Sequence, residues 1–215
     1  MASFDIRVRT RGSLNPGREP AAFASGYTGV VVCTDDETGA ETRVGKVAAL
    51  RVHAAHARAA GVPLFDVCDA HSHELHVLHA LLYSPDGYHF RDAVAARFGA
   101  TESDLLVLDY VVLAPKWRQL KLGLLAVRRL VELIGGGCGL AVSLIAPLRT
   151  DAHAILGVPA SWLPPHADAA DRRAAAATLR KYYRRMGFAR LGRTPYYALA
   201  LGRRAPSVGE ILGGE

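Results

Sequence analysis

Hydrophobic and polar positions alternate along the first quarter of the chain in the manner of half-buried β-strands. Apolar and charged residues alternate through residues 4–10, and residues 27–34 and 42–53 are rich in β-branched and other apolar side chains. The polar segment between the last two runs, residues 35–39, ends in glycine and favours a tight turn. The pattern predicts a strand, a loop rich in Gly, Pro and Ser over residues 11–26, and then a β-hairpin.

A helical period replaces this alternation in the rest of the chain, interrupted by short apolar runs. The expected helices cover residues 72–83 (or 69–83), 90–98, 118–134 and 168–186. The expected further strands cover residues 105–113, 140–146 and 195–201. Asp69 or Ser72 can cap the first helix, and Asp168 the last. We expect residues 149–167, with their prolines, to be irregular and the Gly-rich tail 202–215 to be frayed.

One α/β domain over residues 1–215, with a mixed, mostly antiparallel central sheet flanked by helices, accounts for this order of elements. Half of the residues are hydrophobic, but no apolar run is long enough to cross a membrane. The first residues do not resemble a signal peptide. The three cysteines, Cys33, Cys68 and Cys138, are odd in number and lie far apart in the sequence. This pattern favours reduced thiols over a disulfide framework, and therefore a cytoplasmic location. The sequence does not decide between a monomer and a homodimer.

The net charge of +6 favours anionic partners. Basic residues are densest between Arg172 and Arg204, where few acids interrupt them. CoA phosphates, an acidic protein or nucleic acid would all suit such a surface. We favour a solvated basic helix over a nucleic-acid interface, because the sequence contains no nucleic-acid recognition module.

Residues 105–133 join a buried strand to an amphipathic helix through a cationic turn. The strand ends at Ala114-Pro115, and the turn carries Lys116, Arg118 and Lys121. The first N–H groups of a helix have no intrahelical partners, so a helix that begins here presents donors to a negatively charged ligand. The sequence therefore predicts an anion site at this turn.

A second motif, Tyr183-x-x-x-Gly187-Phe188, closes the last expected helix. Together with the strand, Pro115, an aromatic residue and Arg118, it resembles the GNAT superfamily of acyl-CoA-dependent N-acyltransferases. The resemblance covers about residues 105–201 and implies a GNAT-like fold with its acyl-CoA-binding core there. It also implies that an acetyl or other acyl group passes from acetyl-CoA, or a related acyl-CoA, to a primary amine by direct attack.

The same resemblance assigns the contacts with CoA. Main-chain groups at the end of the central strand would contact the pantetheine arm and the thioester carbonyl, and amides of the turn would hold the pyrophosphate. The strand contacts are Val111, Val112 and Leu113. The turn contacts are Arg118, Gln119, Leu120, Lys121, Leu122, Gly123 and Leu124.

Three positions depart from the family pattern. A small residue, normally Gly, is usual where Lys121 stands and is frequent at Gln119, and the usual Asn is Ala176 here. Gly123 keeps the later small position. Lys121 would either crowd the phosphates or add a charge-assisted contact to them. The alternative function is therefore a non-catalytic GNAT-fold protein that binds a ligand or a partner.

Tyr183 stands where the tyrosine of the family protonates the CoA thiolate. It also belongs to an apolar helix stripe with Leu179, Tyr182 and Met186, which a packing role would explain. Both roles are compatible, because a tyrosine can bury its ring and expose its hydroxyl.

Asp109 is the one acidic residue of the expected strand 105–113, where many relatives have a Glu that takes the amine proton through water. Burial there would raise the pKa of its carboxyl towards that of a useful base. Otherwise it faces outwards and pairs with a basic neighbour. Strand alternation puts Asp109, Val111 and Leu113 on one face unless a bulge intervenes.

Four histidines follow one another on the first expected helix, at positions 71, 73, 76 and 79. Two of them could share a face and bind zinc in a metal-dependent enzyme, but their spacing matches no closed zinc site, so a polar helix face is favoured.

The sequence does not identify the amine acceptor, which could be a small amine, an aminoglycoside, a peptide N-terminus, a lysine side chain or an aminoacyl-tRNA. Residues 66–98 and 149–167 are expected to shape its pocket.

Overall fold

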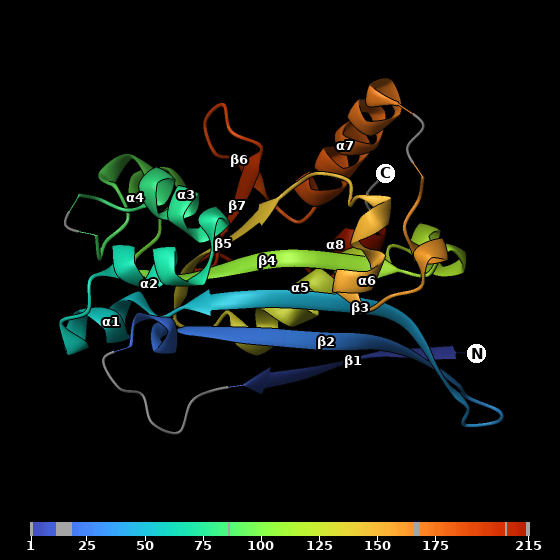
Figure 1. The fold of residues 1–215 in the computed structure, drawn as a ribbon. Coiled ribbons are helices and arrows are strands. Elements are labelled where there is room, and N and C mark those ends of the chain that lie inside the picture. Colours follow the sequence, from blue (N-terminus) through green and yellow to red (C-terminus); the bar gives the residue numbers. More distant parts are fainter. Residues whose placement is uncertain (1, 12–18, 86, 166–167, 205, 214–215) are drawn as a thin grey trace.

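Seven strands form one sheet in the computed structural model, which describes residues 2–11, 19–85, 87–165, 168–204 and 206–213 (Figure 1). The strands are β1 (Ala2–Arg11), β2 (Ala24–Asp35), β3 (Glu41–Val52), β4 (Asp104–Leu113), β5 (Cys138–Leu144), β6 (Ala189–Arg190) and β7 (Tyr196–Ala200). Their order is β1-β2-β3-β4-β5-β7-β6, and among these strands only β4 and β5 are parallel neighbours. The expected mixed, mostly antiparallel sheet flanked by helices is confirmed.

Helices connect the strands and cover both faces of the sheet. The α-helices are α1 (Ala54–Ala60), α2 (Leu64–His71), α3 (His73–Leu82), α4 (Asp92–Phe98), α5 (Leu122–Ile134), α6 (His153–Leu156), α7 (Ala169–Arg184) and α8 (Val208–Gly213). The 3₁₀ helices are η1 (Pro20–Phe23), η2 (Pro115–Leu120), η3 (Thr150–Ala152) and η4 (Ala160–Trp162). Asp168 caps α7 through its side chain, as predicted, and of the two candidates for α3 the cap is Ser72, because Asp69 lies within α2.

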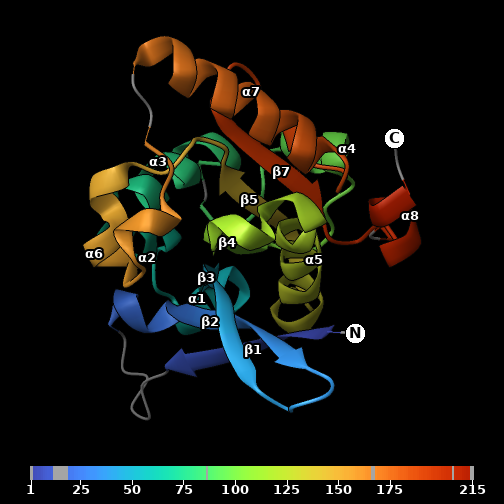
Figure 2. The same cartoon turned by 90° about the vertical axis from the view of Figure 1, so that its right-hand side faces the viewer.

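The sheet separates two hydrophobic cores (Figure 2). Side chains alternate between the faces of a strand, so Leu106 and Leu108 of β4 enter the core under α5 and α8. Leu105 and Val107 enter the opposite core, which α1 to α4 cover. A third, smaller core forms where the segment from η3 to η4 packs against Val112.

β4 and β5 pair over only part of their length. Their ladder runs from Asp104 opposite Cys138 to Leu108 opposite Ser143, whereas β4 continues to Leu113. Figure 1 shows β5 turning away from β4 beyond this point. Asp109 forms a β-bulge here, because Leu108 pairs with Ala49 and Tyr110 with Ala48. The bulge therefore lies where the two strands part, and we call the space between the diverging strands the β4–β5 gap.

Four features differ from the sequence-based expectations. The helix expected from residue 118 begins at Leu122, because η2 occupies residues 115–120. Residues 54–71 form α1 and α2, and β2 begins at Ala24, within the expected loop. The tail is not frayed throughout, because α8 forms and its Ile211 is fully buried. No described helix is long and apolar enough to span a membrane.

Candidate active site

The expected anion site lies at the start of α5, where the backbone makes a left-handed turn. Lys121 has a φ of 56° and is the one residue other than glycine with a positive φ among those described. A side chain disfavours this conformation, which glycine adopts without strain. The Lys121 Nζ donates to the carbonyl of Leu212 in α8 at 2.5 Å, so it is turned towards α8.

Arg118, a second expected phosphate contact, holds the turn together. Its Nε donates to the Leu113 carbonyl at 3.1 Å, and its Nη2 donates to the carbonyl of Trp162. Burial lowers the pKa of this guanidinium. Arg118 and Lys121 are therefore both bound to main-chain carbonyls, while Gln119 and Leu120 lie exposed on η2.

The hydroxyl of Tyr182 occupies the first turn of α5. The Leu124 N–H donates to this oxygen at 3.1 Å. A Cβ on Gly123 would lie 3.3 Å from the same oxygen, so a larger residue here would press against the Tyr182 hydroxyl. The phenol thus stands where an oxygen of a bound anion would lie. Sequence reasoning assigned Tyr182 to packing, and its place in an apolar stripe gave no signal of this contact.

Main-chain groups of β4 face the β4–β5 gap. The Ala114 N–H donates to the Val44 carbonyl at 2.8 Å, and in an antiparallel pair alternate residues bond to the same neighbour. The groups of Val112 therefore face β3, and those of Val111 and Leu113 face the gap. The Leu113 carbonyl already accepts a hydrogen bond from Arg118. Of the three expected strand contacts, Val111 is the best placed to pair with an extended ligand.

Asp109 lies at the gap on the side of α3. Its side chain is accessible to solvent, yet enough protein surrounds it for burial to raise the pKa of its carboxyl to about 6, with a further rise from the charge of Glu74. Glu74, on α3, is half-buried, and burial raises the pKa of its carboxyl too. Sequence reasoning placed Glu74 on a histidine-rich helix but did not connect it with Asp109, because no local pattern links the two positions.

Tyr183 lies on the other face of the sheet, near Ser143 at the end of the β4–β5 ladder. It packs on the core under α5, and burial raises the pKa of its phenol to about 12, with a further rise from Tyr182 and an opposing hydrogen bond with Ser143. The Ser143 hydroxyl donates to the Leu108 carbonyl at 3.0 Å, across the last pair of the β4–β5 ladder. Sequence reasoning missed Ser143, although a serine within an apolar strand was a signal.

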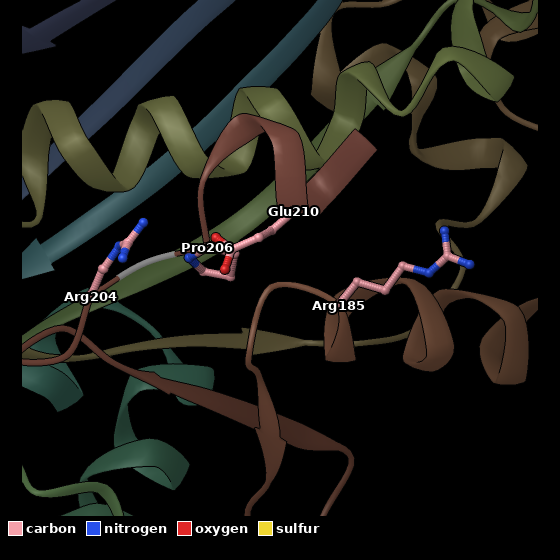
Figure 3. A pocket seen from close by; sticks show the side chains of 4 residues that line it. All are labelled: Arg185, Arg204, Pro206 and Glu210. Carbon is pink, nitrogen blue, oxygen red and sulfur yellow. The ribbon is translucent and has the colours of Figure 1, made fainter. Parts of the chain in front are cut away.

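A shallow depression of about 350 Å³ lies apart from β4 and β5, lined by Arg185, Arg204, Pro206 and Glu210. Figure 3 shows the two guanidinium groups pointing away from each other and from Glu210. No set of donors converges there, so the depression adds nothing to the site at the gap.

The histidines of α2 and α3 have neighbours within the protein. No group of three or more His, Cys, Asp or Glu side chains in the described part of the chain could hold a metal ion. His76 pairs with Asp69 at 3.0 Å, and His79 stacks on Tyr83 with ring centroids 5.5 Å apart. The cysteines are free and buried.

A polar cluster around Asp104 lies at the other end of β4. The carboxylate accepts from Arg51 Nη2 at 2.9 Å and from the Ala55 N–H at 3.1 Å. His53 Nδ1 lies 3.8 Å from it, and His53 Nε2 is 2.8 Å from the Ser25 hydroxyl. The row of Ser, His and Asp resembles a hydrolase triad, but its carboxylate is engaged by Arg51 and the backbone. The cluster therefore ties β2, β3, α1 and β4 together.

We expect Asp104→Asn to destabilise the protein by roughly 2–3 kcal/mol at neutral pH. Burial alone would raise the pKa of Asp104, but His53, the Ala55 amide and Arg51 outweigh it and lower the pKa to about 2. A lowered pKa stabilises the folded state above the unfolded value near 4, and this contribution is lost as the pH falls towards 2. Urea unfolding from pH 7 to pH 3 should show the wild-type advantage shrinking below pH 4. The exposed Asp69→Asn variant is the control and should change stability little.

Comparison with known proteins found no matching family model, no matching curated protein and no matching solved structure.

Proposed function

We propose that the protein is a GNAT-like N-acyltransferase, which moves an acetyl or related acyl group from acyl-CoA to a primary amine. The β4–β5 gap is the observation that carries this proposal. Tyr183 lies near Ser143 at the end of the β4–β5 ladder, on the side of α5, and Asp109 lies at the gap on the side of α3. A direct transfer needs a base near the attacking amine and an acid near the leaving sulfur, both within reach of the reacting carbonyl.

The shape of the gap suits an extended acyl-CoA. Pantetheine is a narrow chain with two amides, which can pair with the N–H and C=O of Val111 as an added strand would. The N–H groups of Leu122, Gly123 and Leu124 at the start of α5 then serve the pyrophosphate. The Tyr182 hydroxyl must yield this place or share it.

The chemistry follows from these positions. The amine nitrogen attacks the thioester carbonyl carbon and forms the C–N bond, while Asp109 takes the released proton through a water molecule. The C–S bond then breaks, and the CoA thiolate takes the proton of the Tyr183 hydroxyl. Tyr183 regains a proton from solvent, as Asp109 loses one. The products are an amide and free CoA.

We expect acetyl-CoA to raise the melting temperature, because a ligand that binds only the folded state stabilises it by roughly 2.7 kcal/mol at a hundredfold excess over its Kd. Gly123→Glu should abolish the rise, since it puts bulk and negative charge beside the N–H groups of α5. Gly136→Glu is the matched control, because a side chain at Gly136 meets no atom within 4 Å. Differential scanning fluorimetry measures the shift in all three proteins.

The absence of a shift with any acyl-CoA at millimolar concentration, in a folded sample, would refute acyl-CoA binding. Turnover is followed separately, as release of the free CoA thiol in the presence of panels of primary amines.

The non-catalytic alternative has its own support. The Tyr182 hydroxyl already occupies the first turn of α5, and Arg118 and Lys121 are bound to carbonyls. A protein that raised its melting temperature with CoA but released no thiol with any amine would be a ligand-binding relative instead.

A further inference from the structure

The outer edge of β1 is a long open edge of the sheet (Figure 1). β1 is the first strand in the order of the sheet, so β2 is its one neighbouring strand among the described residues. Its ten residues pair with β2 without a shift of register, and they contain neither glycine nor proline. An edge of this length, with no bulge or proline, presents a row of N–H and C=O groups that another strand can join.

The hydrogen-bond pattern of the sheet identifies which residues of β1 face outwards. The His53 N–H donates to the Phe23 carbonyl at 2.9 Å, so the odd-numbered residues that follow along β2 bond to β3 and the even-numbered ones to β1. Val30 of β2 is opposite Arg7, so the odd-numbered residues of β1 bond to β2. The main-chain groups of the even-numbered residues therefore point into the open edge. These residues are Phe4, Ile6, Val8 and Thr10.

Three charged side chains of β1 share one face of the sheet. Asp5, Arg7 and Arg9 are exposed there, while the apolar side chains between them are half-buried against the core under α5. The Arg7 guanidinium hydrogen-bonds to both carboxylate oxygens of Glu41, so its charge is already balanced. Within residues 4–10 this leaves one negative charge, on Asp5, and one positive charge, on Arg9, two positions to either side of Arg7.

We propose that two copies of this chain pair through β1 in antiparallel orientation, with Arg7 of each copy at the twofold axis. This register sets Ile6 of one copy opposite Val8 of the other, and the main-chain groups of both face the partner strand. It also sets Asp5 of each copy opposite Arg9 of the other, with Cβ atoms about 5 Å apart, so that two equivalent ion pairs form. The half-buried apolar side chains of the two strands meet on the other face, on the side of α5.

The neighbouring registers are less favourable. An axis one residue nearer the C-terminus would set Arg7 opposite Arg9, and like charges directly opposite each other destabilise a strand pair. An axis one residue nearer the N-terminus would set Asp5 opposite Arg7, whose guanidinium is already bound to Glu41. β1 is thus complementary in charge to a second copy of itself, which favours that partner over another protein. Because a twofold interface is closed, association should stop at the dimer.

Charge reversal tests this register in the full chain. Asp5→Arg and Arg9→Asp each set like charges opposite one another twice, so each variant should be monomeric at concentrations where wild type is dimeric. An equimolar mixture of the two variants should form a heterodimer, because every facing pair then has opposite charges again. Asp66→Arg is the matched control, since it makes the same change of charge at an exposed residue of α2 and should stay dimeric. Sedimentation velocity from micromolar to millimolar concentrations measures the mass in each case.

Amide hydrogen exchange gives a second measurement that does not depend on charge. In the dimer the N–H groups of Ile6 and Val8 bond to the partner strand, whereas the Arg7 N–H bonds to β2 in monomer and dimer alike. Exchange followed residue by residue by NMR should therefore show Ile6 and Val8 protected in wild type and unprotected in Asp5→Arg, with Arg7 protected in both. A wild type that is monomeric throughout, a dimer that survives both single charge reversals, or a mixture of the two variants that stays monomeric overturns the proposal.

Discussion

Replacing Tyr183 with Phe is expected to lower kcat by about a hundred- to ten-thousand-fold, the usual contribution of a general acid or base. The substitution keeps the ring, which packs against Phe188 with centroids 5.3 Å apart, and removes only the hydroxyl. The protein should therefore stay folded, and its Kd for acyl-CoA should change little. Thiol release under saturating acyl-CoA, together with a thermal melt, measures both quantities.

Tyr182→Phe is the matched control for this variant. Its hydroxyl accepts from the Leu124 N–H at the start of α5, so its loss should alter acyl-CoA affinity more than kcat. If Tyr182→Phe were crippled in turnover and Tyr183→Phe were normal, the assignment of the acid to Tyr183 would be wrong. The neighbouring tyrosines thus test which side of α7 supplies the proton.

Local patterns in the sequence were sufficient for most of the elements. Ser72 and Asp168 cap their helices because a short polar side chain can accept from the N–H groups of the next turn. Gly99 ends α4 with a φ of 65°, which glycine adopts without strain. The hairpin of β2 and β3 follows from alternation around a polar turn. These features depend on neighbours within a few positions, so the sequence displays them directly.

Features that depend on distant contacts were not visible in the sequence. The bulge at Asp109 arises from the register of β4 against β3, which no pattern within β4 specifies. The bulge places the Asp109 side chain on one face of the sheet and those of Val111 and Leu113 on the other. Strand alternation without a bulge would have placed all three on the same face. The Lys121 side chain bonds to the carbonyl of Leu212 in α8, about ninety residues further along the chain. The contact between Tyr182 and α5 has the same long-range origin.

The candidate site was predictable in part. The family resemblance directed attention to Tyr183, Asp109 and the start of α5, of which Asp109 lies at the β4–β5 gap and Tyr183 near Ser143 at the end of the ladder. It could not indicate that Arg118 and Lys121 would be bound to carbonyls, because those acceptors come from η4 and α8. Glu74 and Ser143 were missed for the same reason, since each acts on its partner across the fold.

Asp109→Asn is expected to lower kcat/KM by about a hundredfold or more near pH 7, with a smaller loss at high pH. Burial and the charge of Glu74 raise the pKa of Asp109 to about 6, so the wild-type carboxyl becomes an effective base as the pH rises through 6. The wild-type pH–rate profile should therefore have an acidic limb near pH 6, which the Asn variant lacks. At high pH the acceptor amine is already deprotonated, so the missing base matters less.

The stability of the same variant separates a base from a structural partner. A raised carboxyl pKa means that the folded state binds more protons than the unfolded state between about pH 4 and pH 6, so stability falls as the pH rises through that window. Asp109→Asn should therefore not lower the melting temperature at pH 7, and a clear drop there would mark Asp109 as a structural partner. Glu74→Gln removes the neighbouring negative charge and should move the acidic limb to lower pH while Asp109 remains. A limb that stayed in place would mean that Glu74 does not act on the base, and full activity in Asp109→Asn would move the base elsewhere.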